Sequence, residues 1–165
     1  MKNKIGVTIR SINPADKNWI SDFYKNRWNS TRVVSKGVLH EVPNLPGFIA
    51  LKSGLRVGLL TSHIKDREFE IVTLDSLDTY IGIGSRLITT AVEAALNSSC
   101  KRIWLITTND NLPALRFFQK RGFQIAAVHR NALEVSRKLK PEIPQVGLYE
   151  IPLRDEIELE IVLNP

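Results

Sequence analysis

The sequence predicts an α+β fold with a mixed, mostly antiparallel sheet, and three observations indicate it. Two β-rich runs, 47–52 and 56–64, are separated by a Ser-Gly turn, and a third run follows at 68–77. Strands so closely spaced pair as an antiparallel meander. A stripe of apolar residues with helical period then predicts a helix over 84–98, and the continuous apolar run at 103–106 predicts a strand buried on both faces. Because a helix connects them, the strands on either side of it should be parallel.

The N-terminal third should supply a strand, a helix and a long connection. Residues 5–12 alternate between apolar and polar, and Asn13-Pro14 then begins a helix that carries aromatic residues at helical spacing. The stretch 30–46 contains two prolines and has no clean period, so it predicts an irregular loop with room for a short helix. The remaining expected elements are a helix from Asn111 to Gly122, a strand at 123–129, a short basic helix at 132–140, a loop, and a half-exposed antiparallel strand at 156–161.

Length and composition predict a single globular domain over residues 1–165. The chain has 165 residues, of which 43% are hydrophobic and 24% charged, which is typical of a globular protein. No apolar run approaches the length of a membrane span, and the N-terminus lacks the apolar core of a secretory signal. We therefore expect a cytoplasmic protein that does not enter a membrane. Cys100 is the only cysteine, so an intramolecular disulfide is excluded.

The formal charge of +6 favours polyanionic partners, which include nucleic acid and phosphate-rich cofactors. The Lys and Arg residues are scattered along the chain and form no dense basic run. The sequence also lacks a recognisable nucleic-acid-binding motif. A nucleic-acid-binding module is therefore the least favoured of the function classes considered.

The most informative stretch, 74–87, runs from a strand end through a glycine-bearing turn into a helix. Such a turn presents free backbone N–H groups and the positive end of a helix dipole, and Gly82 and Gly84 leave room for an anion to approach. It indicates a phosphate cradle, although an isolated Gly-x-Gly also occurs where only a tight turn is needed. The stretch lacks the third glycine of the dinucleotide fingerprint and the Gly-Lys-Ser/Thr ending of a P-loop.

This turn resembles the pyrophosphate-binding motif of the GNAT superfamily, usually written Gln/Arg-x-x-Gly-x-Gly/Ala. The stretch from Asn111 to Phe123 resembles the second signature of that family, Asn-x-x-Ala-x-x-aromatic-Tyr-x-x-x-Gly-Phe. The resemblance spans roughly residues 56–128, and the flanking segments agree with the family in element order only. The resemblance implies the GNAT acyl-CoA N-acyltransferase fold, in which acyl-CoA lies between a splayed pair of parallel strands. It also implies an acetyl-CoA-dependent N-acetyltransferase that needs no metal.

The family's pattern assigns cofactor-binding roles to particular positions. It implies that the pantetheine arm pairs with the backbone near the strand end, that the pyrophosphate lies on the N–H groups of the turn, and that the second signature packs beside the pantetheine. Two departures stand out: Thr79 replaces the usual Gln or Arg, a loss that Arg86 could compensate, and Phe118 replaces a Tyr thought to protonate the departing thiolate. The implied cofactor-binding residues are Leu74, Ser76, Leu77, Ile81, Gly82, Ile83, Gly84, Ser85, Arg86, Asn111, Phe117 and Phe118.

An acceptor amine is protonated at neutral pH, so its attack on a thioester requires a base. Glu70 is the first candidate, because Glu70-Ile71-Val72 resembles the stretch that holds the general base in the family's histone-modifying members. Asp75 lies nearer the expected thioester, and Glu68 shares the strand face of Glu70. Each acidic residue could instead be an exposed charge on the sheet. A backbone N–H near Leu74 or Asp75 would hold the oxyanion. The three histidines, His40, His63 and His129, have no partner that the sequence reveals.

Two hypotheses about activity therefore remain. The first is transfer of an acetyl group to the primary amine of a small molecule or peptide, and the second is a catalytically weak acyl-CoA-binding sensor or assembly protein of the same fold. Thr79 and Phe118 favour the second, whereas Glu70 and the complete glycine turn favour the first. The segments expected to choose the acceptor, 19–46 and 130–152, carry no interpretable motif, and the sequence leaves the acyl preference and a homodimer open.

Overall fold

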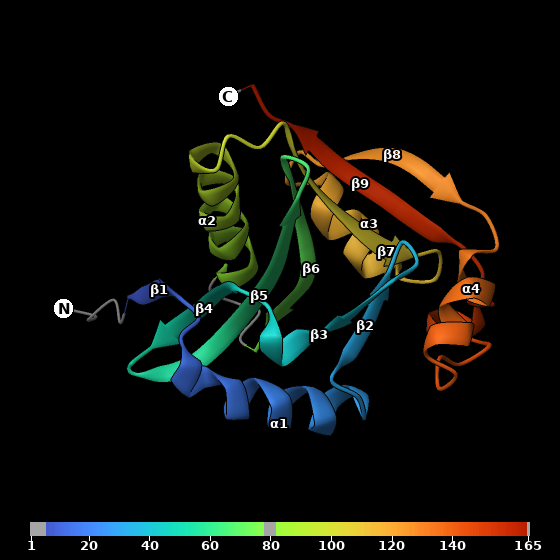
Figure 1. Cartoon of the computed structure of the whole chain (residues 1–165), viewed down its shortest axis with the longest axis horizontal. Helices are drawn as coiled ribbons and strands as arrows, with labels where there is room; N and C mark the ends of the chain where they lie inside the picture. The colour runs from blue at the N-terminus through green and yellow to red at the C-terminus, as the bar shows by residue number, and fades with distance from the viewer. Residues whose placement is uncertain (1–5, 78–81, 165) are drawn as a thin grey trace.

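Over residues 6–77 and 82–164, which the computed structural model describes, the chain forms a seven-stranded sheet flanked by helices (Figure 1). The strand order is β1-β4-β5-β6-β7-β9-β8, and only β6 and β7 are parallel. The strands are β1 (Val7–Ser11), β4 (Gly47–Lys52), β5 (Leu55–Lys65), β6 (Glu68–Ser76), β7 (Arg102–Thr108), β8 (Gln124–His129) and β9 (Glu156–Val162). The helices are α1 (Lys17–Trp28), α2 (Ile83–Asn97), α3 (Leu112–Gln119) and α4 (Ala132–Leu139). The predicted fold class and the parallel pair on either side of α2 are confirmed.

Alternation along the central strands builds a separate core on each face of the sheet. Ala50 and Leu60 belong to the larger core, together with the apolar stripe of α2 and Phe118 of α3. Their neighbours Ile49 and Leu59 point to the other face and pack under α1. The sheet therefore separates α2 and α3 from α1. Within the described residues, none of the helices is both long enough and apolar enough to span a membrane.

The loop expected at 30–46 is wrong for residues 32–41, which form a β-hairpin of β2 (Arg32–Ser35) and β3 (Val38–Glu41), whereas the expected short helix is present as a 3-10 helix, Val42–Asn44. Lys36 and Gly37 form its two-residue turn with φ of 50° and 76°, as a type I′ turn requires. This turn usually carries Asn-Gly or Asp-Gly, and a Lys-Gly pair gives a much weaker signal. The two prolines fall outside both strands, at Pro43 and Pro46.

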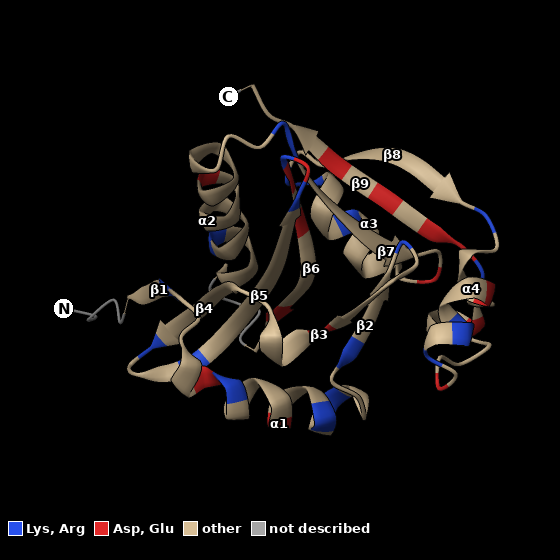
Figure 2. Cartoon of the chain, in the orientation of Figure 1, with Lys and Arg blue, Asp and Glu red and all other residues tan. Residues whose placement is uncertain are grey.

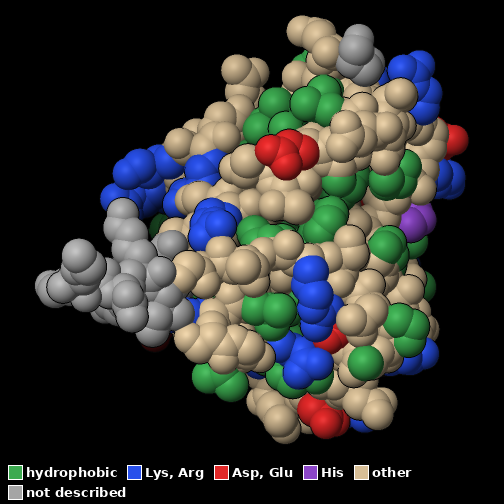
Figure 3. Space-filling view, turned by 90° about the vertical axis from the view of Figure 1, so that its left-hand side faces the viewer, with side chains coloured by type: hydrophobic (Ala, Val, Ile, Leu, Met, Phe, Trp, Pro, Cys, Tyr) green, Lys and Arg blue, Asp and Glu red, His purple; other side chains and the backbone are tan. Residues whose placement is uncertain are grey.

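Positive charge is spread over the surface. Figure 2 shows Lys and Arg on α1, α2, α4 and several strands, with none of these elements uniformly basic. On the face seen in Figure 3, basic side chains are interspersed with apolar and neutral ones. The arrangement differs from the continuous basic stripe that usually accompanies nucleic-acid binding.

Negative charge is concentrated along β9 (Figure 2). The expectation of a half-exposed strand at 156–161 is wrong for its polar face, since Glu156 and Glu158 are both buried. The hairpin covers this face: the backbone N–H of Lys36 donates to Glu156 at 3.1 Å, and the Lys36 Nζ lies 3.0 Å from Glu158. The alternation of β9 was predicted correctly, but nothing in the sequence indicated that the hairpin would cover the acidic side.

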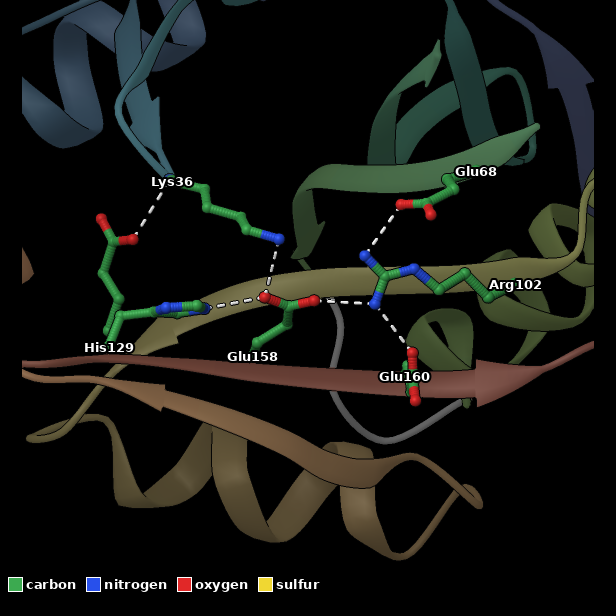
Figure 4. Close-up of polar contacts among 7 residues, drawn as sticks. Lys36, Glu68, Arg102, His129, Glu158 and Glu160 are labelled. Carbon is green, nitrogen blue, oxygen red and sulfur yellow. Dashed lines mark hydrogen bonds and ion pairs between the residues drawn. The ribbon is translucent and has the colours of Figure 1, made fainter. Parts of the chain in front are cut away.

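Glu158 forms the centre of a polar network that joins the hairpin to three strands (Figure 4). One carboxylate oxygen lies 2.8 Å from His129 Nε2 and 3.0 Å from Lys36 Nζ, and the other accepts from Arg102 at 2.7 Å. Burial favours the neutral acid, but the hydrogen bonds from His129, Arg102 and Lys36 outweigh burial and lower the pKa of Glu158 to about 2. The charged form is therefore the one that the fold stabilises.

We predict that Glu158→Gln lowers stability at neutral pH by about 3 kcal/mol, because it leaves Arg102 without one of its carboxylates. The pKa of Glu158 is lower in the folded than in the unfolded state, so its contribution is complete above the unfolded value and is lost as pH falls toward about 2. Urea unfolding from pH 7 to pH 3 should show that the free energy of unfolding falls less steeply with decreasing pH in the variant than in the wild type. An equal decrease in the free energy of unfolding with falling pH in both proteins would contradict the low pKa of Glu158.

Candidate functional site

The parallel strands β6 and β7 pair over only three residues and then part. The paired residues are Glu68, Phe69 and Glu70 with Arg102, Ile103 and Trp104. Beyond them β6 continues to Ser76 beside β5, and β7 continues to Thr108 beside β9. The facing edges of β6 and β7 thus diverge without a strand between them, leaving backbone N–H and C=O groups directed into the gap.

A pocket of about 380 Å³ lies beside this gap, at the N-terminus of α2. This volume is in the range of small-molecule sites. Its lining comes from β6, α2 and α3, and includes eight of the twelve residues predicted to bind a cofactor. The lining residues are Leu74, Ser76, Gly82, Ile83, Gly84, Ser85, Pro113, Ala114, Phe117, Phe118 and Arg121.

Gly82 and Gly84 are each needed in the turn for a different structural reason. Gly82 precedes α2 with φ of 69°, a left-handed conformation that glycine adopts without strain. Gly84 lies under the ring of Phe117, where an added Cβ would come within 2.8 Å of the Phe117 Cζ atom. Gly84 therefore lets α2 and α3 approach closely enough to form the pocket wall. The first N–H groups of α2 have no intrahelical acceptor and can bind an anion there.

Arg121, which sequence reasoning treated only as a basic residue at a helix end, supplies a cation to this pocket. Its guanidinium lies 3.5 Å from the centroid of the Phe117 ring, with Nε 2.8 Å from Ser85 Oγ and Nη1 2.8 Å from the Phe117 carbonyl oxygen. Burial lowers the pKa of Arg121, but a guanidinium remains charged. The available signal was its i+4 spacing from Phe117 in the second signature.

The other predicted cofactor residues lie outside the lining. Arg86 is exposed, and the Leu77 N–H donates to the Val57 carbonyl oxygen of β5 at 2.9 Å. The Asn111 side chain accepts from the Ala114 N–H at 3.2 Å, so it caps α3. Ile81 and Thr79 are outside the described residues. Cofactor contacts by Leu77, Arg86 and Asn111 remain predictions.

An irregularity in β6 sets the directions of its acidic side chains. The register with β5 passes from Ile71 to Thr73, so Val72 forms a bulge. After the bulge Leu74 points to the larger core, as Ile71 does. Glu70 and Asp75 consequently lie on the opposite face from that core, although strict alternation along the strand would separate an even from an odd position.

Asp75 is buried and anchors α1 to β6. The Tyr24 hydroxyl donates a short hydrogen bond to its carboxylate, and Arg27 lies 3.7 Å away. Burial raises the pKa of Asp75, while Tyr24 and Arg27 counteract part of that effect. Burial also raises the pKa of Tyr24, followed by the charge of Asp75, so the phenol stays protonated. Sequence reasoning did not single out Tyr24, whose helical spacing only marked it as a core position.

Glu70 is buried under the hairpin, with 5% of its surface exposed. One of its oxygens lies 3.5 Å from His40 Nε2, and the other, Oε1, has no hydrogen-bond partner among the described residues. The rings of His40 and His63 are 5.4 Å apart. Glu68 instead pairs with Lys101 and Arg102 at the edge of the molecule. Glu70 is therefore the candidate base with a free acceptor oxygen, and the expectation that the histidines lack partners is wrong for His40 and His129.

The family model described as the acetyltransferase (GNAT) family matches residues 17–123 of this chain. The match covers both signatures and the parted strands. The chain belongs to the GNAT family. The matched range includes every residue that lines the pocket at the N-terminus of α2.

The chain is also similar to a known bacterial protein in sequence and to solved structures in fold. The chain is 40% identical to the uncharacterized protein YdhI of Bacillus subtilis (strain 168) over 92% of this chain and 96% of that protein. Its fold is similar to a GNAT family acetyltransferase from Elizabethkingia anophelis with acetyl-CoA bound (TM-score 0.70, 20% identity, covering 97% of this chain and 100% of that one). It is also similar to an IAA acetyltransferase from Bacillus cereus ATCC 14579 (TM-score 0.68, 21% identity, covering 96% and 100%).

Across the part of the chain that the structure describes, no three His, Cys, Asp or Glu side chains are grouped to hold a metal ion. Cys100 is buried in the larger core. Burial raises the pKa of its thiol, with Arg67 opposing the shift. Cys100 thus has the surroundings of a packed side chain, because nucleophilic cysteines have lowered pKa values and solvent access.

We predict that Gly84→Val weakens CoA binding at least tenfold, because the added side chain would displace Phe117 from the pocket wall. Isothermal titration calorimetry with CoA measures the effect. Thr89→Val on the exposed side of α2 is the control for perturbation of the helix and should bind CoA normally. Unchanged affinity in a folded Gly84→Val protein would place the CoA site elsewhere.

We predict that Arg121→Gln reduces CoA affinity about tenfold, whereas Arg86→Gln changes it less than twofold. Arg121 lines the pocket beside Ser85, while Arg86 is exposed outside the lining. Charge-assisted hydrogen bonds to phosphate are worth roughly 1.5–3 kcal/mol, so loss of one is measurable. Titrations of both variants at two salt concentrations should show a weaker salt dependence for Arg121→Gln. The reverse ranking would assign the phosphate contact to Arg86.

Proposed function

We propose that this protein is an N-acetyltransferase that transfers the acetyl group of acetyl-CoA directly to a primary amine. The observation that carries the proposal is the pocket between β6, α2 and α3, where a glycine turn, a helix N-terminus and Arg121 converge beside two parted strands. The acetyl-CoA bound to the similarly folded protein from Elizabethkingia anophelis supports this choice of donor. Acetyl-CoA supplies the activated carbonyl carbon that the amine attacks.

The residues present suit the two polar parts of acetyl-CoA. The N–H groups at the start of α2 and the Arg121 guanidinium suit the diphosphate, which carries negative charge. The unpaired edge of β6 near Leu74 offers backbone groups to the amides of the pantetheine arm. Phe117 and Phe118 supply the apolar wall. Most of these contacts are made by the backbone, so the Thr79 departure does not remove them.

Glu70 is the residue to which we assign the role of general base. It has an oxygen free to accept a proton, whereas the Asp75 carboxylate already contacts Tyr24 and Arg27. In the reaction one ammonium proton passes to Glu70, and the neutral amine nitrogen forms a bond to the acetyl carbon. The carbon–sulfur bond then breaks to release CoA as the thiolate, and the nitrogen loses its second proton to water. Asp75 then serves to position α1 beside β6. A backbone N–H near Leu74 stabilises the oxyanion of the intermediate.

Phe118 cannot protonate the departing sulfur. It is buried and packs edge-on against Phe117 and Phe123. The pocket lining within the described residues contains no tyrosine. A thiol with a pKa near 8.5 leaves readily as a thiolate at neutral pH, so water can supply its proton. The absence of an acid at this position slows the chemistry less than it would for an alkoxide leaving group.

The alternative, a GNAT protein that binds acyl-CoA with little turnover, is favoured by this Phe118 packing and by the burial of Glu70 under the hairpin. A thiol-release assay with acetyl-CoA and a panel of polyamines, amino acids, aminoglycosides and lysine peptides separates the two functions. Release of CoA that depends on an amine, with recovery of the acetylated amine by mass spectrometry, establishes the transferase. Tight acetyl-CoA binding without release for any amine establishes the binder.

We predict that Glu70→Gln lowers kcat about 10²- to 10³-fold while the KM for acetyl-CoA changes less than twofold, because the base acts on the acceptor. The loss should be greatest at low pH, where less of the amine is already deprotonated. Steady-state kinetics from pH 6 to pH 9 measure both effects. Glu68→Gln removes the same charge from the same strand and should remain within about threefold of wild type. A wild-type kcat in Glu70→Gln would exclude Glu70 as the base.

A further inference from the structure

Three of the four buried side-chain atoms that lack a hydrogen-bond partner in the described residues lie between the β2–β3 hairpin and the sheet. They are Ser35 Oγ, His40 Nε2 and Glu70 Oε1. Ser35 and His40 occupy the face of the hairpin that is turned toward the sheet, and both are buried. Each such unpaired group costs about 1–3 kcal/mol. Their convergence at one place indicates a site that a ligand completes.

Two buried carboxylates lie among these atoms. Glu70 and Glu156 are both at least 95% buried, and among the described residues neither forms an ion pair with a lysine or arginine. Glu156 accepts only neutral hydrogen bonds, from Ser136 Oγ at 3.1 Å and from the Lys36 backbone N–H. Burial raises the pKa of Glu156; the hydrogen bonds from Ser136 and Lys36 and the charge of His129 oppose this shift, and the charge of Glu70 adds to it. Two buried carboxylates without cations are costly, and two positive charges would offset both.

The same place already holds one primary ammonium group. The Lys36 Nζ lies 5.0 Å from the centroid of the Trp104 ring and 3.0 Å from Glu158, a combination of aromatic face and carboxylate that recognises ammonium ions. Trp104 lies beside Glu70 in the register of β6 and β7. The Lys36 side chain is 41% exposed, so this side of the site reaches solvent. An incoming amine can therefore replace the Lys36 ammonium from outside.

We propose that the side-chain cluster of Ser35, Lys36, His40, Glu70, Trp104 and Glu156, which we call the acidic chamber, binds the acceptor and selects acceptors with a second ammonium group besides the amine that is acylated. This inference rests on the proposed function. The acidic chamber lies at the point where β6 and β7 begin to part, on the face of β6 opposite the acyl-CoA pocket. The acceptor amine thus approaches the thioester from the face of the sheet opposite the one that holds the rest of acetyl-CoA.

The charge of the acidic chamber decides which amines it takes. A diamine or polyamine can place one nitrogen at Glu70 and another at Glu156 and Trp104. A monoamine leaves one carboxylate without a cation, and an amino acid adds a carboxylate where two are already buried. The ranking expected from these charges is diamine first, monoamine second and amino acid last.

The test compares 1,3-diaminopropane, propylamine and β-alanine as acceptors at pH 8, by CoA release and by calorimetric binding in the presence of CoA. These probes share a three-carbon chain or its near equivalent and differ in their second charged group. We expect kcat/KM for the diamine to exceed that for propylamine at least tenfold, with no detectable turnover of β-alanine. Equal kcat/KM for the diamine and the monoamine would overturn the inference while leaving the proposed function intact.

Variants locate the effect in the acidic chamber. Glu156→Gln should reduce the preference for the diamine over propylamine at least fivefold without changing the KM for acetyl-CoA. Ser35→Ala, a smaller change that keeps the chamber's charge, should raise the KM for the diamine two- to fivefold and serves where Glu156→Gln does not fold. Glu134→Gln removes the same charge from the exposed side of α4 and should leave the preference unchanged. An unaltered preference in Ser35→Ala and in a folded Glu156→Gln would place the acceptor elsewhere.

The calorimetric measurement of diamine binding distinguishes failure of this inference from failure of the proposed function. Diamine binding that is weakened by Glu156→Gln, together with no CoA release for any amine, would support the acidic chamber and reject the transferase. Release of CoA with propylamine as efficient as with the diamine would support the transferase and reject the acidic chamber. Absence of both diamine binding and CoA release would reject the chamber as a site for dications.

Discussion

The parting of β6 and β7 after three paired residues is the constraint on which the rest of the site depends. Each strand keeps a full antiparallel partner on its other side, β5 for β6 and β9 for β7, so the gap opens without loss of the sheet. Arg102 lies at the first of the three paired positions, opposite Glu68, and contacts Glu68, Glu158 and Glu160, which joins three neighbouring strands (Figure 4). These ion pairs hold β6 and β7 together at the end where the two strands are paired.

The bulge at Val72 determines which side chains of β6 point to each face of the sheet. Leu74 reaches the pocket under α2 and α3, while Glu70 and Asp75 face the hairpin and α1. A carboxylate on the same face as the cofactor phosphates would repel them. In the proposed function, separating the faces keeps the acids away from the anionic donor and beside the cationic acceptor, with the backbone of β6 between the two.

Positive and negative charges are also distributed differently, with the cations on the surface and the carboxylates buried under the hairpin. The chain has a formal charge of +6, with basic side chains scattered over the surface, yet the most buried ionisable groups under the hairpin are carboxylates. Scattered surface cations raise the local concentration of an anionic cofactor only weakly in salt. Buried carboxylates act at short range in a medium of lower polarity, so they influence the choice of ligand more strongly.

The sequence by itself determined the fold class, the parallel pair, the α2 cradle and most of the pocket lining, because these depend on local periodicity, capping and a glycine turn. Only the tertiary structure decided the β2–β3 hairpin, the burial of Glu156 and Glu158 and the positions of Tyr24 and Arg121. The hairpin turn has a weak local signal, and one bulged residue changes the face of every later side chain on β6. Contacts between residues far apart in the chain, such as Lys36 with Glu158 or Arg121 with Ser85, leave no trace in a pattern read along one strand or helix, because they arise only when the sheet brings those elements together.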